Sequence, residues 1–287
     1  MSRSSRSGGV VGALVIAVLL MGAAQTNPAL RAKFSELVAW GWAGGPAPSV
    51  TVTLPTTLPA LPAPGPVTTG SAGATVDPAA IDKALTTLST LPVKSRIKDE
   101  TYDRSCKVGH ACSFGAAWTD DQSAPAGHNG CGTRDDVLKE QLSGPVLKAG
   151  SRCTVVAGTL TADPYTGASV TFVPGDAVQI DHVVPLALAY DQGANAWPLD
   201  KRKAFANDTA LNLLATAGPV NNFKSDMTAA EWLKAVQPPD KTMQVVMTDP
   251  NRRCAFGVKY VSVMAAYGLP ITPEDKAALT TAFGACR

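Results

Sequence analysis

Gln179-Ile-Asp-His-Val-Val-Pro-Leu186 is the most informative segment of this 287-residue sequence. It is an apolar, strand-like run that carries one of only three histidines directly after an aspartate. Successive side chains of a strand point to opposite faces, so Asp181 and His182 are expected on the two sides of one strand. An isolated Asp-His pair is more often a simple ion pair than a functional site. Its interpretation therefore depends on the segments that follow.

Two asparagine-bearing segments follow it along the chain. Asn212 lies in an apolar L-N-L-L stretch, where a buried amide must find hydrogen-bond partners, and we expect it to hold the loop that bears His182. Asn221 lies in a helix-like V-N-N-F-K stretch, and Lys224, three residues further on, shares its helix face. We expect Asn221 to bind a metal ion and Lys224 to neutralise a phosphate.

Taken together in this order, these residues predict hydrolysis of a phosphodiester bond. His182 is the expected general base, since the ordinary imidazole pKa of about 6.5 suits neutral pH. The Asp181 carboxylate and the Asn221 carbonyl are hard oxygen ligands, which favours Mg²⁺ or Mn²⁺ over zinc. The metal ion is expected to act as a Lewis acid and as a template for the phosphate.

The same segments resemble those of a known enzyme family. The match rests on the D-H-V-V-P-L, L-N-L-L and N-x-x-K segments, with further matches at Cys131-Gly-Thr-Arg134 and Asp163-Pro-Tyr-Thr-Gly167. This pattern resembles the HNH (ββα-metal) endonucleases, in particular the exported bacterial group of the DUF1524, GmrSD C-terminal-like type. The resemblance extends over about residues 102–286.

The resemblance implies a fold and a set of roles. It implies an α+β fold in which a ββα-metal (HNH, His-Me finger) core is embedded in a helix-rich, disulfide-stabilised domain. In this pattern Asp181 binds the metal, His182 is the base and Asn212 supports the hairpin. Asn221 matches the third motif position, which is often His in other HNH enzymes. The HNH domain of RNA-guided DNA-cutting effectors carries the same kind of substitution, so the resemblance remains compatible with activity.

The formal net charge is only +2, so nucleic-acid binding must come from local basic clusters. Arg134, Lys201 and Arg202 are candidates for contacts with the DNA backbone, which give affinity without sequence information. The alternative for Lys201 and Arg202 is that they lie on a solvated helix face. Trp118 is expected either near the site or in the core.

The six cysteines predict three disulfides in an exported chain. Several connectivities are compatible with the sequence, and we favour the pairing of nearest neighbours, Cys106–Cys112, Cys131–Cys153 and Cys254–Cys286. Zinc binding is the alternative, but the sequence has no C-x-x-C and its cysteine–histidine spacing matches no common zinc site.

The N-terminus has the features of a targeting segment. Arg3 and Arg6 precede an apolar run over residues 10–24 that ends in small residues. A cleaved secretory signal is favoured over an uncleaved membrane anchor, because the run is shorter than the roughly 20 residues that a spanning helix needs. Either reading places the protein outside the cytoplasm, secreted or anchored to the cell envelope.

We therefore divide the chain into a signal peptide or anchor (1–24), a Pro/Thr/Ala-rich linker (25–75) and a nuclease domain (76–287). The linker is rich in proline and has no charge between residues 44 and 75, so it cannot bury enough apolar surface to fold. Helices are expected at 27–43, 78–91, 135–147, 186–192, 198–207, 227–236, 253–267 and 273–283. Asp77 is expected to cap the helix at 78–91, and Thr228, with Glu231 three positions on, the helix at 227–236. Strands are expected at 151–160 and 169–180, with a turn at 163–167.

The sequence thus predicts an exported, monomeric, Mg²⁺-dependent endonuclease that cuts DNA with little sequence specificity. A ribonuclease of the same fold is one alternative, since this chemistry does not use the 2′-hydroxyl. A non-catalytic envelope protein, in which the domain serves only as a scaffold or binding module, is the other. Contact with the membrane or envelope is expected only through the N-terminal segment.

Overall fold

The computed structural model describes residues 75–175, 177–239 and 243–286, which belong to one compact unit. The predicted signal or anchor, the helix at 27–43 and the linker up to residue 74 lie outside the described residues. Within the described ranges, no helix has both the length and the apolar composition needed to cross a membrane.

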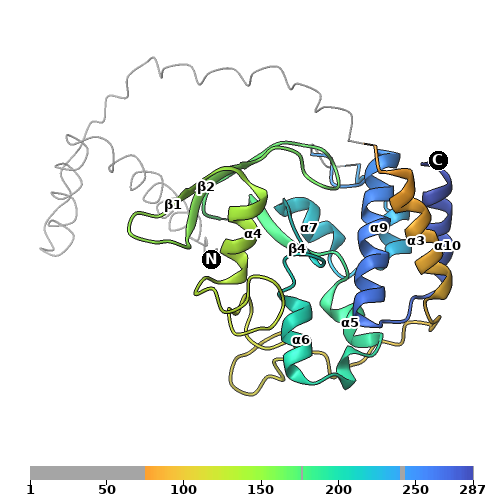
Figure 1. Ribbon diagram of the computed structural model, residues 1–287, viewed down its shortest axis with the longest axis horizontal. Coiled ribbons are helices and arrows are strands. Elements are labelled where there is room, and N and C mark those ends of the chain that lie inside the picture. Colours follow the sequence, from red (N-terminus) through yellow and green to blue (C-terminus); the bar gives the residue numbers. More distant parts are fainter. Residues whose placement is uncertain (1–74, 176, 240–242, 287) are drawn as a thin grey trace, which may run out of the picture. The chain divides into compact units, whose positions relative to one another are not determined.

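The described domain is a mixed α+β structure (Figure 1). Its helices are α3 Pro78–Thr90, α4 Thr133–Gln141, α5 Leu186–Asp191, α6 Leu199–Ala206, α7 Gly218–Lys224, α8 Ala229–Lys234, α9 Pro250–Tyr267 and α10 Pro273–Gly284, with a 3-10 helix at Ala194–Ala196. Its strands are β1 Ser143–Leu147, β2 Val155–Leu160, β3 Val170–Phe172, β4 Val178–His182 and β5 Leu213–Ala217.

The strands form two small antiparallel sheets, one of order β1-β2-β3 and one of β4 and β5 alone. In the second sheet Asp181 pairs with Leu214 and His182 with Leu213. Strand β5 runs directly into α7, which packs against both strands. Two antiparallel strands followed by a helix therefore carry the segment that the sequence singles out.

Two sequence predictions are wrong, one for a helix and one for a strand. The helix expected at 135–147 ends at Gln141, and Ser143–Leu147 is strand β1, paired with β2. Gly144 adopts a positive φ of 59°, which a right-handed helix does not allow. Pro145 follows it and has no amide hydrogen to donate to a helical hydrogen bond. The strand expected at 169–180 is likewise divided, by Pro174-Gly175, into β3 and β4.

The other predicted elements are confirmed to within a few residues. Asp77 caps α3 by accepting a hydrogen bond from the Ala79 amide. Thr228 and Glu231 form a capping box at α8, which satisfies amides that the first turn leaves unpaired. Caps of this kind are local, which explains why the sequence predicts them well.

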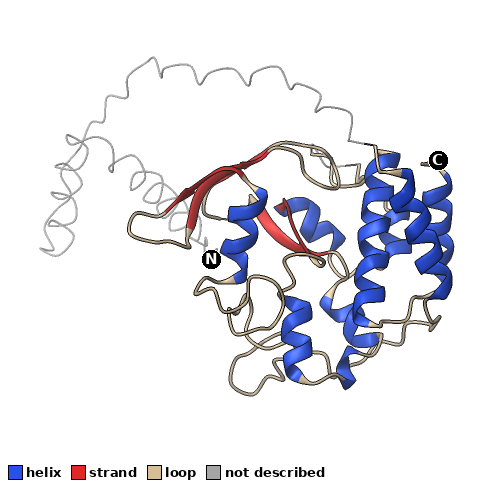
Figure 2. Cartoon of the chain, in the orientation of Figure 1, coloured by secondary structure: helices blue, strands red, loops and turns tan. Residues whose placement is uncertain are grey.

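The larger hydrophobic core lies among the helices. Helices α3, α9 and α10 lie side by side, and their buried faces include Leu88, Val261 and Leu279 (Figure 1). A smaller core lies between α4 and the strands and includes Val137, Ile180 and Leu213. Figure 2 shows the strands on the side of the domain away from the three-helix group. The β4–β5 pair thus has buried residues from both cores around it.

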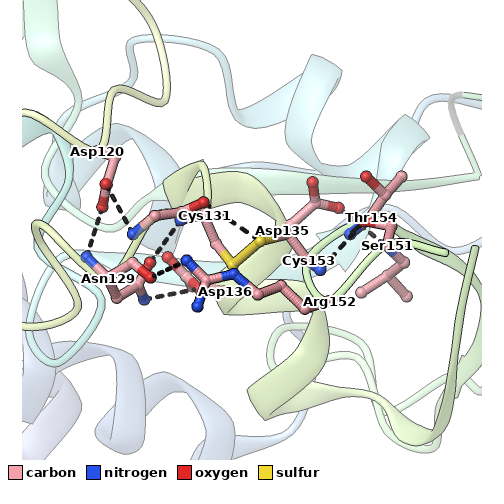
Figure 3. Close-up of a disulfide and its surroundings, with 11 residues drawn as sticks. Asp120, Asn129, Cys131, Asp135, Asp136, Ser151, Arg152, Cys153 and Thr154 are labelled. Atoms are coloured by element: carbon pink, nitrogen blue, oxygen red, sulfur yellow. Dashed lines mark hydrogen bonds between the residues drawn. A yellow bond between two sulfur atoms is a disulfide. The ribbon is translucent and has the colours of Figure 1, made fainter.

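The three predicted disulfides are confirmed, with no free cysteine among the described residues. Cys254–Cys286 joins α9 to the end of α10, and Cys106–Cys112 closes a short loop. Cys131–Cys153 ties the start of α4 to the approach to β2 (Figure 3). The chain just before Cys131 is held by Asp120, whose carboxylate accepts hydrogen bonds from the backbone amides of Asn129 and Gly130 (Figure 3).

Candidate active site

Asp181 and His182 are the last two residues of β4, and both side chains are almost completely buried, with 3% and 7% exposure. Helix α7 contacts β4 and brings Asn221 and Lys224 to the same region. The region is built from one strand pair and the helix that follows it. The geometry of each side chain depends on its hydrogen bonds, which differ from residue to residue.

The Asp181 carboxylate is held from two sides. Lys224 Nζ lies 3.0 Å from Oδ1, and the Tyr165 hydroxyl donates to Oδ2. Lys224 Nζ also donates to the His182 carbonyl oxygen at 2.9 Å. Burial raises the pKa of Asp181, and the opposing charge of Lys224 is the largest effect that lowers it. The carboxylate is therefore fixed in position, with its charge compensated inside the protein.

Tyr165 reaches Asp181 from the turn between β2 and β3. This turn is the predicted D-P-Y-T-G segment, and the Asp163 carboxylate, which is fully buried, fixes it to β5. Asp163 accepts from the Tyr165 and Thr166 amides within the turn and from the Ala217 amide of β5, at 2.7 to 3.0 Å. The turn thus has a role that its sequence does not indicate, because it delivers a hydroxyl to the buried carboxylate.

The predicted phosphate contact of Lys224 is corrected by this geometry. Its side chain has 0% exposure, and its ammonium is engaged by Asp181 and the His182 carbonyl. From the helix face that Lys224 shares with Asn221 we expect a phosphate as its partner, but the structure shows a carboxylate instead. The face that carries Lys224 packs onto β4, so the ammonium meets a buried carboxylate before it can meet a substrate.

The hydrogen bond of His182 determines its tautomer. Nε2 lies 2.8 Å from the Ala206 carbonyl oxygen, which can only accept, so Nε2 carries the proton and Nδ1 keeps its lone pair. Burial, and next the positive charge of Arg104, lowers the pKa of His182 to about 3. Trp118 stacks on the imidazole with ring centroids 5.7 Å apart, which places it at the site. The imidazole is therefore neutral at neutral pH, with its lone pair on Nδ1. Its pKa lies below the ordinary value of about 6.5 on which the sequence prediction of a general base relied.

Asn212 is fully buried and holds the segment after β4, as the sequence predicts. Its Oδ1 accepts from the Val184 amide at 2.9 Å, and its Nδ2 donates to the Phe205 carbonyl oxygen at 3.3 Å. Its own carbonyl oxygen accepts from the Val183 amide at 2.8 Å. These bonds connect the chain after His182 with the end of α6, which also supplies the acceptor for Nε2.

Asn221 is half-buried, and its amide orientation is set by Gln179. Asn221 Nδ2 donates to Gln179 Oε1 at 2.8 Å, which leaves the Asn221 carbonyl oxygen as the free acceptor. Gln179 and Asp181 are two residues apart on β4, so they lie on the same face of the strand. Asp181, His182 and Asn221 line one pocket of about 410 Å³.

Comparison with known proteins identifies the family. Residues 132–260 match the C-terminal domain of GmrSD restriction endonucleases. A protein of Arthroderma benhamiae described as an uncharacterized secreted protein is 31% identical over 157 residues, which is 54% of this chain and 68% of that protein. The chain belongs to the GmrSD C-terminal domain family. No solved structure matches the chain.

The match confirms the GmrSD C-terminal resemblance and assigns a nuclease-type domain to the chain. All the site residues described so far lie within residues 132–260, apart from Trp118 and Arg104. A GmrSD-type endonuclease domain implies a nucleic acid as substrate.

The predicted backbone-binding cations of this GmrSD-type domain do not line the pocket. Arg134 donates to the Val178 carbonyl oxygen at 3.2 Å, and Arg202 donates to that of Asn195 at 3.3 Å. Lys201 lies over the Trp197 ring, 4.2 Å from its centroid. All three side chains contact protein groups, and the structure does not bring them together with Asp181 and His182.

Two other cations, Lys98 and Arg104, line the pocket, and no sequence motif singles out either of them. They precede the matched range 132–260, in a segment with no motif of its own. About eighty residues separate them from His182, and such contacts depend on tertiary packing rather than on local pattern. The only signal in the sequence is that Arg104 is a basic residue two positions before the first cysteine, Cys106.

The pocket offers oxygen ligands for a hard cation. Among the described residues, no group of three or more His, Cys, Asp or Glu side chains could hold a metal ion. Asp181 and Asn221 nevertheless line one pocket, and the Asn221 oxygen is left free by the bond to Gln179. A carboxylate and an amide oxygen suit a metal such as Mg²⁺ that keeps several waters, so this donor set fits the predicted ion.

Proposed function

We propose that this protein is an exported, metal-dependent endonuclease of the ββα-metal (HNH) type that hydrolyses phosphodiester bonds of DNA with little sequence specificity. The single observation that carries the proposal is the state of His182. Its Nε2 is held by the Ala206 carbonyl oxygen, which leaves Nδ1 as the free nitrogen, in one pocket with a carboxylate and an amide oxygen. A general base for water has to have such a free lone pair.

The order of elements supports the proposed core. Strand β4 ends with Asp181 and His182, β5 pairs with it, and α7 follows directly with Asn221 in it. Two antiparallel strands and a helix, with an acid, a base and an amide at these places, are what a ββα-metal core requires of the chain. Asn212 acts as a positioning residue, since it fixes the segment behind His182.

His182 Nδ1 takes the proton from the attacking water in the proposed reaction. The Ala206 carbonyl holds the opposite nitrogen, so the ring cannot turn its basic nitrogen away without losing a buried hydrogen bond. Trp118 covers one face of the ring and restricts it further. These contacts keep the base oriented before the substrate arrives.

Asp181 and Asn221 would hold the Mg²⁺ or Mn²⁺ ion through one carboxylate and one amide oxygen. When bound, the ion supplies Lewis-acid stabilisation of the charge that develops on the phosphate. Lys224 and Tyr165 orient the Asp181 carboxylate through their hydrogen bonds. The proposed roles of these two residues are positional, because both are buried behind the carboxylate.

The proposed location is outside the cytoplasm, secreted or attached to the envelope through the N-terminal segment, with the protein acting as a monomer. Three disulfides support an oxidising compartment, since such bonds are rare in the cytosol. The relative from Arthroderma benhamiae is described as secreted. The predicted signal segment points the same way.

A plasmid-nicking assay on the full chain with its disulfides intact tests the proposal. Reactions contain Mg²⁺, Mn²⁺ or EDTA, and His182→Ala is compared with His128→Ala, which removes an imidazole that does not line the pocket. We expect metal-dependent cutting, reduced about 10²–10⁴-fold by His182→Ala and little changed by His128→Ala. Cleavage of RNA but not of DNA would favour the ribonuclease. No cleavage of either by folded protein would favour the non-catalytic scaffold.

A further inference from the structure

We propose that Lys98 and Arg104 form a clamp for the phosphodiester backbone, supplied by the segment that precedes the family domain. The inference rests on the proposed function and deepens it, because it assigns the substrate-binding cations of the same pocket. Both residues line the pocket with Asp181, His182 and Asn221. Neither belongs to the matched range 132–260.

The charge balance of the pocket favours an anionic ligand. Its two carboxylates are already neutralised by the protein, since Lys224 pairs with Asp181 at 3.0 Å and Arg96 pairs with Asp226 at 3.0 Å. Two cations of the pocket lining remain. These are Lys98, near Asp226, and Arg104, near His182. The pocket therefore carries an excess of positive charge that faces solvent.

The side chains of Lys98 and Arg104 are exposed, and within the described ranges neither forms a hydrogen bond or an ion pair. The contrast with the predicted cations is direct, because Arg134, Lys201 and Arg202 all donate to backbone carbonyl oxygens. A guanidinium that keeps all its donors free can bind a phosphate with two parallel hydrogen bonds.

Arg104 is placed beside the proposed base. It lies over the Trp118 ring, 5.9 Å from the centroid, and Trp118 in turn stacks on His182. Arg104 and His182 also line a second, smaller cavity together with Trp118. Both residues contact the same indole and line the same two cavities, so a phosphate-binding group lies close to the water-activating one.

The backbone that carries Arg104 is fixed before any substrate binds. Asp103 accepts at its carbonyl from the Ser113 amide at 2.8 Å, and Ser105 accepts from the Cys112 amide at 3.0 Å. The Cys106–Cys112 disulfide closes the short loop that follows Arg104 and that both bonds enclose. Binding therefore needs to order only the Arg104 side chain, which reduces the entropic cost of the contact.

Lys98 is fixed in a similar way by its neighbours. The Arg96 guanidinium lies 2.7 Å from the Asp191 carboxylate, and the Asp99 amide donates to the same carboxylate at 2.9 Å. The first contact holds the segment through the Arg96 side chain and the second through the backbone of Asp99, and both connect it to Asp191 at the end of α5. The flexible Lys98 side chain then projects from an anchored segment into the pocket lining.

The test measures binding separately from cleavage. The full chain carrying His182→Ala, which binds without cutting, is titrated onto a short fluorescein-labelled DNA duplex at several NaCl concentrations. Adding Arg104→Ala is expected to weaken binding about tenfold, the effect of removing hydrogen bonds to a charged group. It should also lower the salt slope by about 0.9 for each phosphate that the protein no longer neutralises. Lys98→Ala should weaken binding in the same direction by a smaller factor.

Lys107→Ala is the matched control, since it removes one exposed positive charge from the disulfide loop that follows Arg104 without touching the pocket. Arg104→Lys keeps the charge but not the planar fork, so it should keep the salt slope and lose part of the affinity. Melting curves show whether each variant remains folded.

The outcomes separate this inference from the proposed function. Absence of all cutting by the unmodified chain overturns both. Cutting that depends on His182, with Arg104→Ala and Lys98→Ala binding as tightly as Lys107→Ala, overturns the clamp alone. A slower cleavage rate for Arg104→Ala at saturating DNA with unchanged affinity also overturns the clamp and assigns Arg104 to positioning Trp118.

Discussion

Two regions of this protein meet at one pocket and hold their charged groups in opposite ways. In the first, the β4–β5–α7 unit, Asp181 and Lys224 are buried and pair with each other. In the second, residues 94–118, Lys98 and Arg104 are exposed, and the backbone rather than the side chain is fixed. The first is built like a catalytic core and the second like a binding surface.

The difference shows where charge can be removed without damage. A buried ion pair gains little over apolar packing, but the loss of one partner leaves an uncompensated charge in a dry environment. An exposed cation is screened by water, so its removal barely affects folding. Substitutions in the β4–β5–α7 unit should therefore destabilise the fold, and substitutions in residues 94–118 should affect substrate binding.

Lys224→Met tests the buried side of this comparison with the largest expected effect. It leaves the Asp181 carboxylate buried without its cation, so the free energy of unfolding should fall by about 3–5 kcal/mol. Denaturant titration measures the change. Lys107→Met, at an exposed position, should change it by no more than about 0.5 kcal/mol. Equal effects of the two substitutions would contradict a buried ion pair.

Asn212→Ala should have the next largest effect. It leaves the Val184 amide and the Phe205 carbonyl without partners in a buried setting, for about 2–3 kcal/mol of unfolding free energy. Asn222→Ala, on the exposed part of α7, is the control and should be nearly silent. Because Asn212 holds the segment behind His182, the variant should also cut more slowly at saturating substrate. A stable, fully active variant would remove its positioning role.

Replacing Cys106 and Cys112 by serine should affect the substrate binding assigned to residues 94–118 and not the chemistry assigned to the β4–β5–α7 unit. The closed loop is short, so the chain-entropy model gives a decrease of about 2 kcal/mol in unfolding free energy. Because the loop begins two residues after Arg104 and its closure holds the neighbouring backbone, affinity for DNA should fall while the cleavage rate at saturating DNA is kept. Anisotropy and single-turnover kinetics distinguish the two, and a variant with slower chemistry and normal affinity would be the opposite result.

Asp226→Asn should have the smallest effect on stability. The hydrogen bond from Arg96 is the main cause that lowers the pKa of Asp226, so its contribution is present above the ordinary carboxyl pKa and is lost as pH falls through the lowered value. The Asp226 side chain is 56% exposed, which limits the effect to less than about 1 kcal/mol. Unfolding measured between neutral and acidic pH should show a slightly shallower pH dependence for the variant.

The sequence predicts the parts of this molecule that depend on neighbouring residues. The cap at Asp77, the capping box at Thr228 and the burial of Asn212 follow from local pattern, and the structure confirms them. The nearest-neighbour disulfides are confirmed in the same way. The helix predicted to extend past Gln141 fails at Gly144, where a glycine and a proline outweigh the helical spacing before them.

The sequence could not predict which side chains face each other across the fold. Helical spacing places Lys224 correctly on the face of α7 that carries Asn221, yet only the packing of α7 on β4 shows that its ammonium meets Asp181. Tyr165 comes to the site from a hairpin turn and Arg104 from the segment just before a disulfide loop, and neither lies near His182 in the sequence. Such contacts depend on tertiary packing.

Single-turnover cleavage measured over a range of protein concentrations tests the central claim most directly, because it gives affinity and chemical rate in one experiment. The claim is that the β4–β5–α7 unit performs the chemistry and that residues 94–118 bind the substrate. We predict that His182→Ala loses the chemical rate with its DNA affinity intact, and that Arg104→Ala loses affinity with its rate at saturation nearly unchanged. The reverse assignment, or one shared defect in both variants, would contradict it.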